Sequence, residues 1–284
     1  MKNKVPHLTR YLLIWLCSAF ALAGNANSQI SFPSADSGVS HSSVTALEYR
    51  AADQPLHYSE EPFQSVRLWL PSSAGKKEKL IAFIHGGRWL NEFDMEHIYP
   101  SATALAHKGY AVWSLEYRRT GDSNAGWPGS YNDVKAGIQW LSNLSSFGAD
   151  TEDVAIVGHS VDGPLALLAG RDFFKVNRIV GSAAITGIVK YADGTNDYET
   201  ATTLCMGSIF AQAKELYQTA NPANLNLYKK TALCHSTADS IVNISQSDLQ
   251  NAGVLGIQQA DHFDWLRPST EVFRLPQNSL EKPF

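Results

Sequence analysis

The chain contains 284 residues, and a composition of 44% hydrophobic and 18% charged residues is typical of one large globular domain. Its net charge of −4 at pH 7 argues against a nucleic-acid partner, because phosphate backbones are bound by basic surfaces. The cysteines form no C-x-x-C pair, and no cluster of histidines and cysteines has the spacing of metal ligands. The sequence therefore predicts neither a metal nor another cofactor.

The first 23 residues have the pattern of a secretory signal peptide. Lys2, Lys4 and Arg10 precede a run of thirteen residues, YLLIWLCSAFALA, which ends in the small residues Ala21 and Ala23. That run is too short to span a hydrocarbon core of roughly 30 Å. We therefore expect cleavage after residue 23, export to the periplasm or the medium, and no stable membrane span afterwards. An uncleaved anchor is the alternative.

Residues 24–42 are rich in Ser, Asn and Gly without periodicity, which predicts a flexible arm before a domain over residues 43–284. Export would permit a disulfide between Cys205 and Cys234. The apolar run around Cys234 is equally typical of a buried thiol, so both states remain open.

Apolar strand patterns alternate with helical patterns along the domain, which predicts an α/β fold. The sheet is expected to be mainly parallel and doubly wound, with helices on both faces. Residues 187–228 interrupt the alternation and predict a lid-like insertion before the strand that carries the catalytic acid. The expected strands are Val66–Pro71, Leu80–Gly87, Tyr110–Arg118, Val154–Gly158, Arg178–Thr186, Thr231–Ser236 and Gly253–Gln258; the expected helices are Pro100–Lys108, one through Val134, Ile138, Leu141 and Leu144, and one after Ser160.

Ser160 is the candidate nucleophile, because the stretch VGHSVDG passes directly from a predicted strand into a predicted helix. Such a tight turn exposes the serine oxygen and needs small residues at its flanks. Gly158 satisfies this requirement two residues before the serine. Asp162 stands two residues after it, where a small residue is usual, and a glycine follows only at Gly163.

A second turn, FIHGGRW, follows an earlier strand about seventy residues upstream. In this position the backbone N–H groups of Gly87 and Arg88, together with that of Val161, would form an oxyanion hole. A glycine pair that merely makes a turn is the alternative reading of this segment taken alone.

Asp239 and His262 complete the candidate catalytic set. A serine hydroxyl needs a base to remove its proton, and the base needs an acid to hold its tautomer. Asp239 follows a predicted strand in CHSTADSIVN, and His262 follows the last strand in QQADHFDWLRP. The three residues thus occur in the order Ser, Asp, His along the chain. Trp89, Trp127 and Tyr131 are expected to line an apolar substrate pocket, with ordinary core packing as the alternative for each.

These motifs together resemble the α/β-hydrolase superfamily, in particular its esterase, hormone-sensitive-lipase-like and kynurenine-formamidase-like branch. The resemblance rests on HGGRW, EYRRTGD with GWPGSYNDV, VGHSVDG, HSTADSIV and ADHFDWLRP, and it covers about residues 66–268. It implies that Ser160, Asp239 and His262 form a triad.

The resemblance also implies an exported serine hydrolase that cleaves a small carboxylic ester through a covalent acyl-enzyme. An arylformamide or amide hydrolase with the same triad is one alternative. A catalytically impaired binding protein on the same scaffold is another, and Asp162 is the feature that motivates it. If a charged Asp162 lay about 8 Å from a developing oxyanion, the penalty would be roughly 2 kcal/mol, or about thirtyfold in rate. We therefore expect a weakened but working nucleophile.

Overall fold

The structure is a computed structural model, and it describes residues 30–71, 78–224 and 230–281. The expected signal peptide over residues 1–23 lies outside the described residues. Within the described ranges, no helix is both long and apolar enough to cross a membrane.

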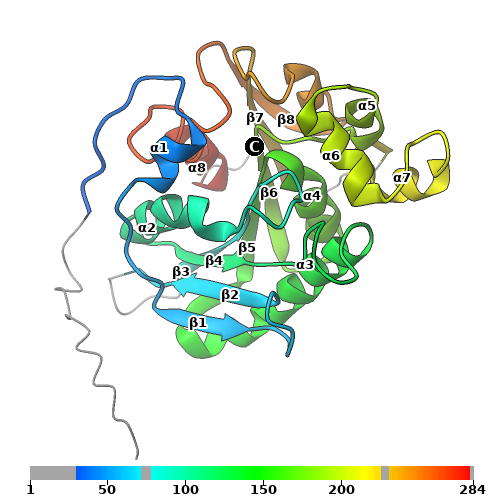
Figure 1. The fold of residues 1–284 in the computed structure, drawn as a ribbon. Helices are drawn as coiled ribbons and strands as arrows, with labels where there is room; N and C mark the ends of the chain where they lie inside the picture. The colour runs from blue at the N-terminus through cyan, green and yellow to red at the C-terminus, as the bar shows by residue number, and fades with distance from the viewer. Residues whose placement is uncertain (1–29, 72–77, 225–229, 282–284) are drawn as a thin grey trace, which may run out of the picture.

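One eight-stranded sheet forms the centre of the molecule, in the spatial order β1-β2-β4-β3-β5-β6-β7-β8 (Figure 1). β1 pairs antiparallel with β2, and β2 pairs antiparallel with β4. Every other pair, from β4 to β8, is parallel. This confirms the expected mainly parallel sheet. The strands are β1 (Gln54–His57), β2 (Ser65–Trp69), β3 (Glu78–Ile84), β4 (Ala111–Leu115), β5 (Ala149–His159), β6 (Val176–Ser182), β7 (Lys230–Ser236) and β8 (Gly253–Ile257).

Helices cover both faces of the sheet, as expected of a doubly wound fold (Figure 1). One face carries α1 (His41–Thr45), α2 (Tyr99–His107) and α8 (Arg274–Glu281), and the other carries α3 (Gly129–Trp140) and α4 (Gly163–Asp172). Short 3₁₀ helices add to these elements: η1 (Met95–Ile98), η2 (Leu141–Phe147), η3 (Ser160–Asp162), η4 (Pro222–Asn224) and η5 (Ile244–Ser247).

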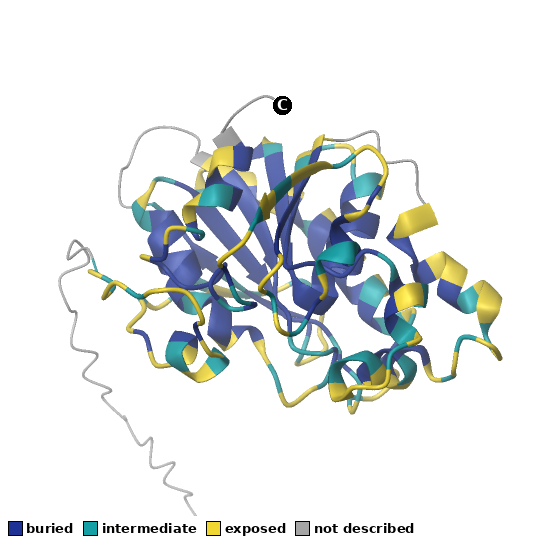
Figure 2. Ribbon diagram, turned by 90° about the horizontal axis from the view of Figure 1, so that it is seen from above, coloured by how far each residue is buried: buried dark blue, intermediate teal, exposed yellow. Residues whose placement is uncertain are grey.

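Alternate residues of β3 enter two different cores. Leu80, Ala82 and Ile84 pack with α3 and α4, whereas Ile81 and Phe83 pack with α2 and the C-terminal segment. Because both faces are buried, the strand reads as a continuous apolar run rather than an alternating one. Figure 2 shows the central strands in the buried colour between partly exposed outer layers.

The expected flexible arm differs from the structure in its second half. Phe32 and Ala35 pack against the core beside α2, and Val39 is buried. The backbone N–H groups of Gly38 and Val39 donate to the Asp264 carboxylate over 3.0 and 2.8 Å. From residue 30 onward this segment is therefore docked on the domain. The Ser-, Asn- and Gly-rich composition of the segment did not indicate this docking, because its acceptor, Asp264, lies more than 220 residues away in sequence.

The predicted insertion is helical and follows the carboxyl end of β6. It contains α5 (Ile188–Ala192), α6 (Asp197–Met206) and α7 (Lys214–Ala220), followed by η4. Asn196 and Glu199 form a capping box that fixes the start of α6. A role of this insertion as a lid remains a prediction.

Cys205 and Cys234, the two described cysteines, are buried free thiols. Burial raises the pKa of each thiol to about 12, so both are uncharged at neutral pH. The sequence left open whether these cysteines form a disulfide or remain thiols, and in the structure both are thiols.

Candidate active site

The three candidate catalytic residues lie at the carboxyl edge of the parallel strands. Ser160 directly follows β5, while Asp239 and His262 lie in the loops after β7 and β8. The carboxyl ends of neighbouring parallel strands meet at one edge, which is where ligands bind in open α/β sheets. The fold therefore brings together residues that are 23 to 102 positions apart.

Ser160, His262 and Asp239 form a continuous hydrogen-bonded chain. His262 Nε2 lies 2.8 Å from Ser160 Oγ, and its Nδ1 lies 3.0 and 3.2 Å from the two carboxylate oxygens of Asp239. Ser160 is 7% exposed and His262 only 2%. A histidine with a carboxylate on Nδ1 presents an unprotonated Nε2 to the serine, as a general base requires.

The carboxylate of Asp239 is held in its charged form. Burial alone would raise its pKa, but the hydrogen bond and charge of His262 lower it, and so do the N–H groups of Ile241 and Val242. Those two groups donate to Oδ1 over 2.9 and 2.8 Å. The pKa of Asp239 is consequently below its ordinary value, so the acid is ionised at neutral pH.

Two further side chains hold the loop that carries His262. Asp261 Oδ1 accepts from the N–H and hydroxyl of Ser240 and from the N–H of His262, over 2.8 to 2.9 Å. His159 Nε2 donates to the His262 carbonyl oxygen over 3.0 Å. Burial, together with the neighbouring His262, lowers the pKa of His159 to about 3, so this ring is neutral. This contact of His159 was not predicted from the sequence.

The glycine turn after β3 packs directly against the serine turn. Ile84 pairs with Gly158 in the sheet, so the ends of β3 and β5 lie side by side. A Cβ atom added to Gly86 would lie 3.2 Å from Ser160 Cβ and 3.1 Å from the His159 carbonyl oxygen. The turn continues with positive φ angles of 130° at Gly87 and 59° at Arg88. This adjacency is what an oxyanion hole shared by Gly87, Arg88 and Val161 requires.

The serine turn itself is tightly packed and locally strained. Ser160 has a φ of 60°, which is unfavourable for a residue with a Cβ atom. A Cβ atom on Gly158 would lie 2.6 Å from Ala166 Cβ, and one on Gly163 would lie 2.6 Å from the Ile185 carbonyl oxygen. The second glycine is therefore needed three residues after the serine, where α4 crosses the segment after β6.

The surroundings of Asp162 differ from those assumed for a charged carboxylate near the oxyanion. Its side chain is fully buried, and both of its carboxyl oxygens lie 2.7 Å from the Tyr117 hydroxyl. Burial raises its pKa to about 7, despite His85, Tyr117 and Arg119, which lower it. Burial therefore favours the uncharged carboxyl and weakens the full charge that was assumed beside the oxyanion.

The three aromatic residues expected to line the substrate pocket differ in burial and in their contacts. Trp89 is 1% exposed within the core beside α3 and α4. Tyr131 donates to Asp172, the last residue of α4, which is about 13 Å along the helix from its first residue. Trp127 stacks on Tyr131 with ring centroids 5.0 Å apart and donates to Thr219. The packing alternative therefore holds for Trp89, whereas a pocket role for the half-buried Trp127 and Tyr131 remains a prediction.

Arg88 links the glycine turn to the predicted insertion. Its guanidinium lies 4.8 Å above the Tyr198 ring and donates to the Asp197 carbonyl oxygen over 3.1 Å. Both partners belong to the first turn of α6. Any displacement of α6 would therefore act on the turn that contains Gly87 and Arg88.

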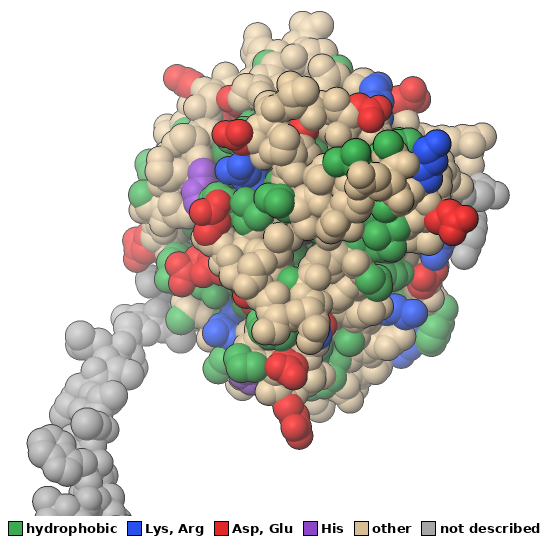
Figure 3. Space-filling view, turned by 45° about the vertical axis from the view of Figure 1, so that its right-hand side comes forward, with side chains coloured by type: hydrophobic (Ala, Val, Ile, Leu, Met, Phe, Trp, Pro, Cys, Tyr) green, Lys and Arg blue, Asp and Glu red, His purple; other side chains and the backbone are tan. Residues whose placement is uncertain are grey.

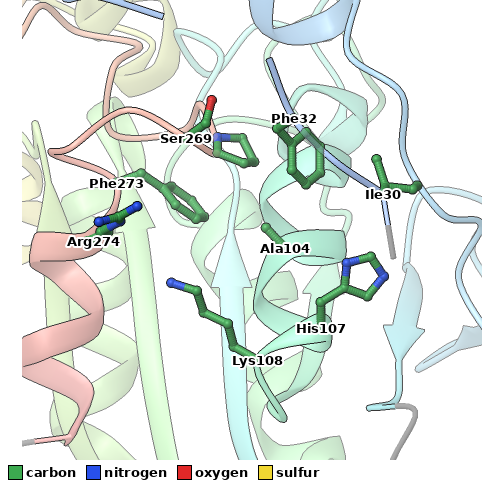
Figure 4. A pocket seen from close by; sticks show the side chains of 9 residues that line it. Ile30, Phe32, Ala104, His107, Lys108, Ser269, Phe273 and Arg274 are labelled. Atoms are coloured by element: carbon green, nitrogen blue, oxygen red, sulfur yellow. The ribbon is translucent and has the colours of Figure 1, made fainter. Parts of the chain in front are cut away.

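Two cavities lie near these elements. One, of about 490 Å³, is bordered by Tyr191, Glu199 and the backbone around Asp239, between the insertion and the acid loop. The other, of about 160 Å³, lies between the N-terminal segment, α2 and the C-terminal segment (Figure 4). The second contains Phe32 and Phe273 and none of the candidate catalytic residues, so we assign it to the docking of the N-terminal segment.

The charges on one face and the grouping of possible metal ligands bear on whether an ionic ligand could bind. On the face drawn in Figure 3, acidic and basic side chains are interspersed rather than separated by sign. Among the described residues, no group of three or more His, Cys, Asp and Glu side chains is placed to hold a metal ion.

Comparison with known proteins places these features in a family. The model of the BD-FAE family matches residues 66–252, which is well over half of the chain. The chain belongs to the BD-FAE family. The matched segment contains the glycine turn, the serine turn and Asp239, and it ends before His262.

Curated relatives of this BD-FAE protein are esterases. Esterase LipC of Mycobacterium tuberculosis is 30% identical over 115 residues, which are 40% of this chain and 28% of that protein. Probable carboxylesterase 5 of Arabidopsis thaliana is 29% identical over 172 residues, 53% of each chain. The chain thus spans about half the length, or less, of these relatives.

Solved structures share the fold at low sequence identity. A truncated carbohydrate esterase from gut microbiota superposes with a TM-score of 0.69 at 20% identity, covering 82% of this chain and 98% of that one. Esterase B from Lactobacillus rhamnosis gives a TM-score of 0.67 at 18% identity, with 85% and 90% covered. Together with the sheet order, these similarities identify the α/β-hydrolase fold.

Proposed function

We propose that this protein is an exported serine esterase that hydrolyses small carboxylic esters through a covalent acyl-enzyme. The observation that carries the proposal is the chain from Ser160 Oγ through the His262 ring to the Asp239 carboxylate, with hydrogen-bond distances of 2.8 and 3.0 Å. The esterase relatives support the same reaction class.

In the proposed reaction, Ser160 Oγ attacks the ester carbonyl carbon while His262 Nε2 removes the hydroxyl proton. Asp239 stabilises the imidazolium that results. The carbonyl oxygen becomes an oxyanion and accepts hydrogen bonds from the backbone N–H groups of Gly87, Arg88 and Val161. His262 then gives its proton to the departing alkoxide, and the acyl group remains on Ser160.

Deacylation repeats these steps with water as the nucleophile. His262 removes a proton from the water, the hydroxide attacks the acyl carbon, and the proton returns to Ser160 Oγ as the carboxylic acid leaves. In enzymes of this kind each oxyanion donor contributes about 10²- to 10³-fold to kcat. The amino end of α4, which lies just beyond η3, adds the positive end of the helix dipole.

The residues around the site favour catalysis over the binding-protein alternative. Asp162 motivated that alternative as a charge beside the oxyanion, yet its carboxyl is buried against Tyr117 and its pKa is raised to about 7. The serine, base and acid are hydrogen-bonded to one another, which a scaffold used only for binding would not need.

Export is the other part of the proposal, and it rests on the pattern of residues 1–23. Intact-mass analysis of the protein from a periplasmic or culture fraction tests it. We expect the mature chain to begin at Gly24. A full-length chain retained in the membrane fraction would support the uncleaved anchor instead.

The ester hypothesis is tested by comparing the hydrolysis of an aryl acetate with that of the matching formanilide by the wild-type protein. Ser160→Ala should lower ester turnover by about 10⁴-fold or more. Ser142→Ala, at an exposed serine of η2, is the matched control and should leave turnover unchanged. Faster turnover of the formanilide would favour the amide alternative. Ligand binding without turnover of either substrate would favour the binding protein.

A further inference from the structure

Asp162 and Tyr117 form a buried pair behind the serine turn. Both side chains are 0% exposed, and no water-facing surface remains to either. Asp162 belongs to η3 and opens α4, two residues after Ser160, whereas Tyr117 lies two residues beyond the end of β4. The pair therefore joins the serine turn to a strand that is not its neighbour in the sheet.

The geometry of the pair leaves room for a proton on Asp162, since the carboxyl is fully buried against a single hydroxyl group. The Tyr117 hydroxyl lies 2.7 Å from each carboxyl oxygen of Asp162. The single hydroxyl hydrogen is either shared between both oxygens of a charged carboxylate or donated to one oxygen of an uncharged carboxyl. The second short contact becomes a hydrogen bond if Asp162 is protonated and donates back to the tyrosine oxygen.

Tyr117 also contacts the segment that leads into the glycine turn. Its ring stacks on His85 with centroids 5.0 Å apart, and its hydroxyl lies 3.5 Å from the His85 carbonyl oxygen. His85 is followed by Gly86, which packs against Ser160. Tyr117 thus contacts both the serine turn, through Asp162, and the segment that leads into the glycine turn.

The charges around Asp162 are those of a closed buried network. His85 faces the Gly86 carbonyl oxygen with one ring nitrogen and Glu116 with the other, so both nitrogens carry hydrogen and the ring is a cation. Burial lowers the pKa of His85, but Glu116 outweighs it and the pKa is raised. Arg119 pairs with the same Glu116 over 3.2 Å.

Burial dominates the protonation of Asp162 itself. His85, Tyr117 and Arg119 favour its charged form, Glu116 opposes it, and the pKa is raised to about 7. On the side of the insertion, Asp162 faces the buried Cys205, whose thiol is uncharged. The uncharged carboxyl is therefore well populated at and below neutral pH.

We propose that Asp162 is a positioning residue for the proposed esterase reaction, which holds the serine turn against Tyr117 and the glycine turn while its carboxyl group is uncharged. On ionisation the carboxyl loses the proton that makes the second hydrogen bond. It also places a negative charge two residues from Ser160, where the oxyanion develops. Turnover should fall as this group ionises.

The test is the pH profile of kcat/KM for an aryl acetate between pH 5 and 10, with three variants. Asp162→Asn keeps the shape and both hydrogen bonds to Tyr117 without a titrating group. Tyr117→Phe removes the donor that favours the charged form, so the carboxyl should ionise at higher pH. Asp172→Asn is the matched control, since Asp172 ends the same helix, accepts from Tyr131 and is exposed.

We expect wild type and Asp172→Asn to lose activity above about pH 7 relative to Asp162→Asn, by up to roughly thirtyfold at pH 9. In Tyr117→Phe the fall should begin at higher pH. A role confined to folding would lower all rates by one factor and leave the profiles parallel. Parallel profiles for wild type, Asp162→Asn and Tyr117→Phe would overturn the proposal.

The inference rests on the proposed function, and the two fail differently. Absence of turnover by the wild type at every pH, or full turnover by Ser160→Ala, would remove the esterase proposal itself. If Asp162→Asn does not fold, the displaced profile of Tyr117→Phe decides the question. An unchanged profile in that variant would overturn the inference while leaving the esterase intact.

Discussion

Replacing Asp162 by asparagine should make the protein more stable at alkaline pH and change how its stability depends on pH. In the folded protein the pKa of Asp162 is raised from 3.8 to about 7, because the carboxyl is fully buried. The folded state therefore holds a proton that the unfolded chain releases between these two values. The stability that this proton provides is present at low pH and is lost as the pH rises through about 7.

A difference of about three pKa units corresponds to about 4 kcal/mol between pH values well below 3.8 and well above 7. The amide introduced by Asp162→Asn does not titrate, so this slope should be missing from the variant. The assay is urea denaturation of wild type and Asp162→Asn at pH 5, 6, 7 and 8. Titrating groups that are not coupled to Asp162 are common to both proteins, so their effects cancel in the difference.

The free energy of unfolding of wild type should fall relative to Asp162→Asn by about 3 kcal/mol from pH 5 to pH 8. Asp172→Asn serves again as the exposed control and should run parallel to wild type. A constant difference between wild type and Asp162→Asn over this range would refute the reasoning, because it would mean that Asp162 does not gain a proton on folding.

Asp239→Asn should lower kcat by about 10⁴-fold with little change in folding, since the amide favours the wrong tautomer of His262; aryl acetate kinetics measure it, and a tenfold loss or less would contradict the assigned acid. His159→Phe removes the donor to the His262 carbonyl oxygen, and we expect kcat to fall by about tenfold with KM nearly unchanged. Asp264→Ala leaves the N–H groups of Gly38 and Val39 without their acceptor. It should lower the free energy of unfolding by about 2 kcal/mol and speed proteolysis within residues 30–47; cleavage at the wild-type rate would mean that this anchor does not hold the segment.

Sequence patterns predicted the parts of the fold that depend on local periodicity. The apolar strands of the sheet and the α3 and α4 helices occur where the patterns indicated them. β1 was not predicted, because it has only four residues, includes Pro55, and alternates between intermediate and exposed positions. Edge strands of this kind have a weak apolar signal.

The candidate site, like the fold, was predicted in part. The order of Ser160, Asp239 and His262 in their motifs predicted three residues that the structure joins in one hydrogen-bonded chain through His262. The environment of Asp162 was misjudged because it depends on which distant element packs against this residue. The sequence alone does not show that the sheet places Tyr117 behind this carboxyl group, so the group was treated as a charge next to the serine turn.

The central claim is that Ser160 is an activated nucleophile beside a formed oxyanion hole. The most direct measurement is the intact mass of the mature protein after exposure to a fluorophosphonate, alongside Ser160→Ala. Such reagents need an activated serine and an oxyanion hole, and they require no guess about the substrate. We expect one covalent adduct on the wild-type protein and none on Ser160→Ala. A well-folded wild-type protein that forms no adduct, or an adduct that persists in Ser160→Ala, would contradict it.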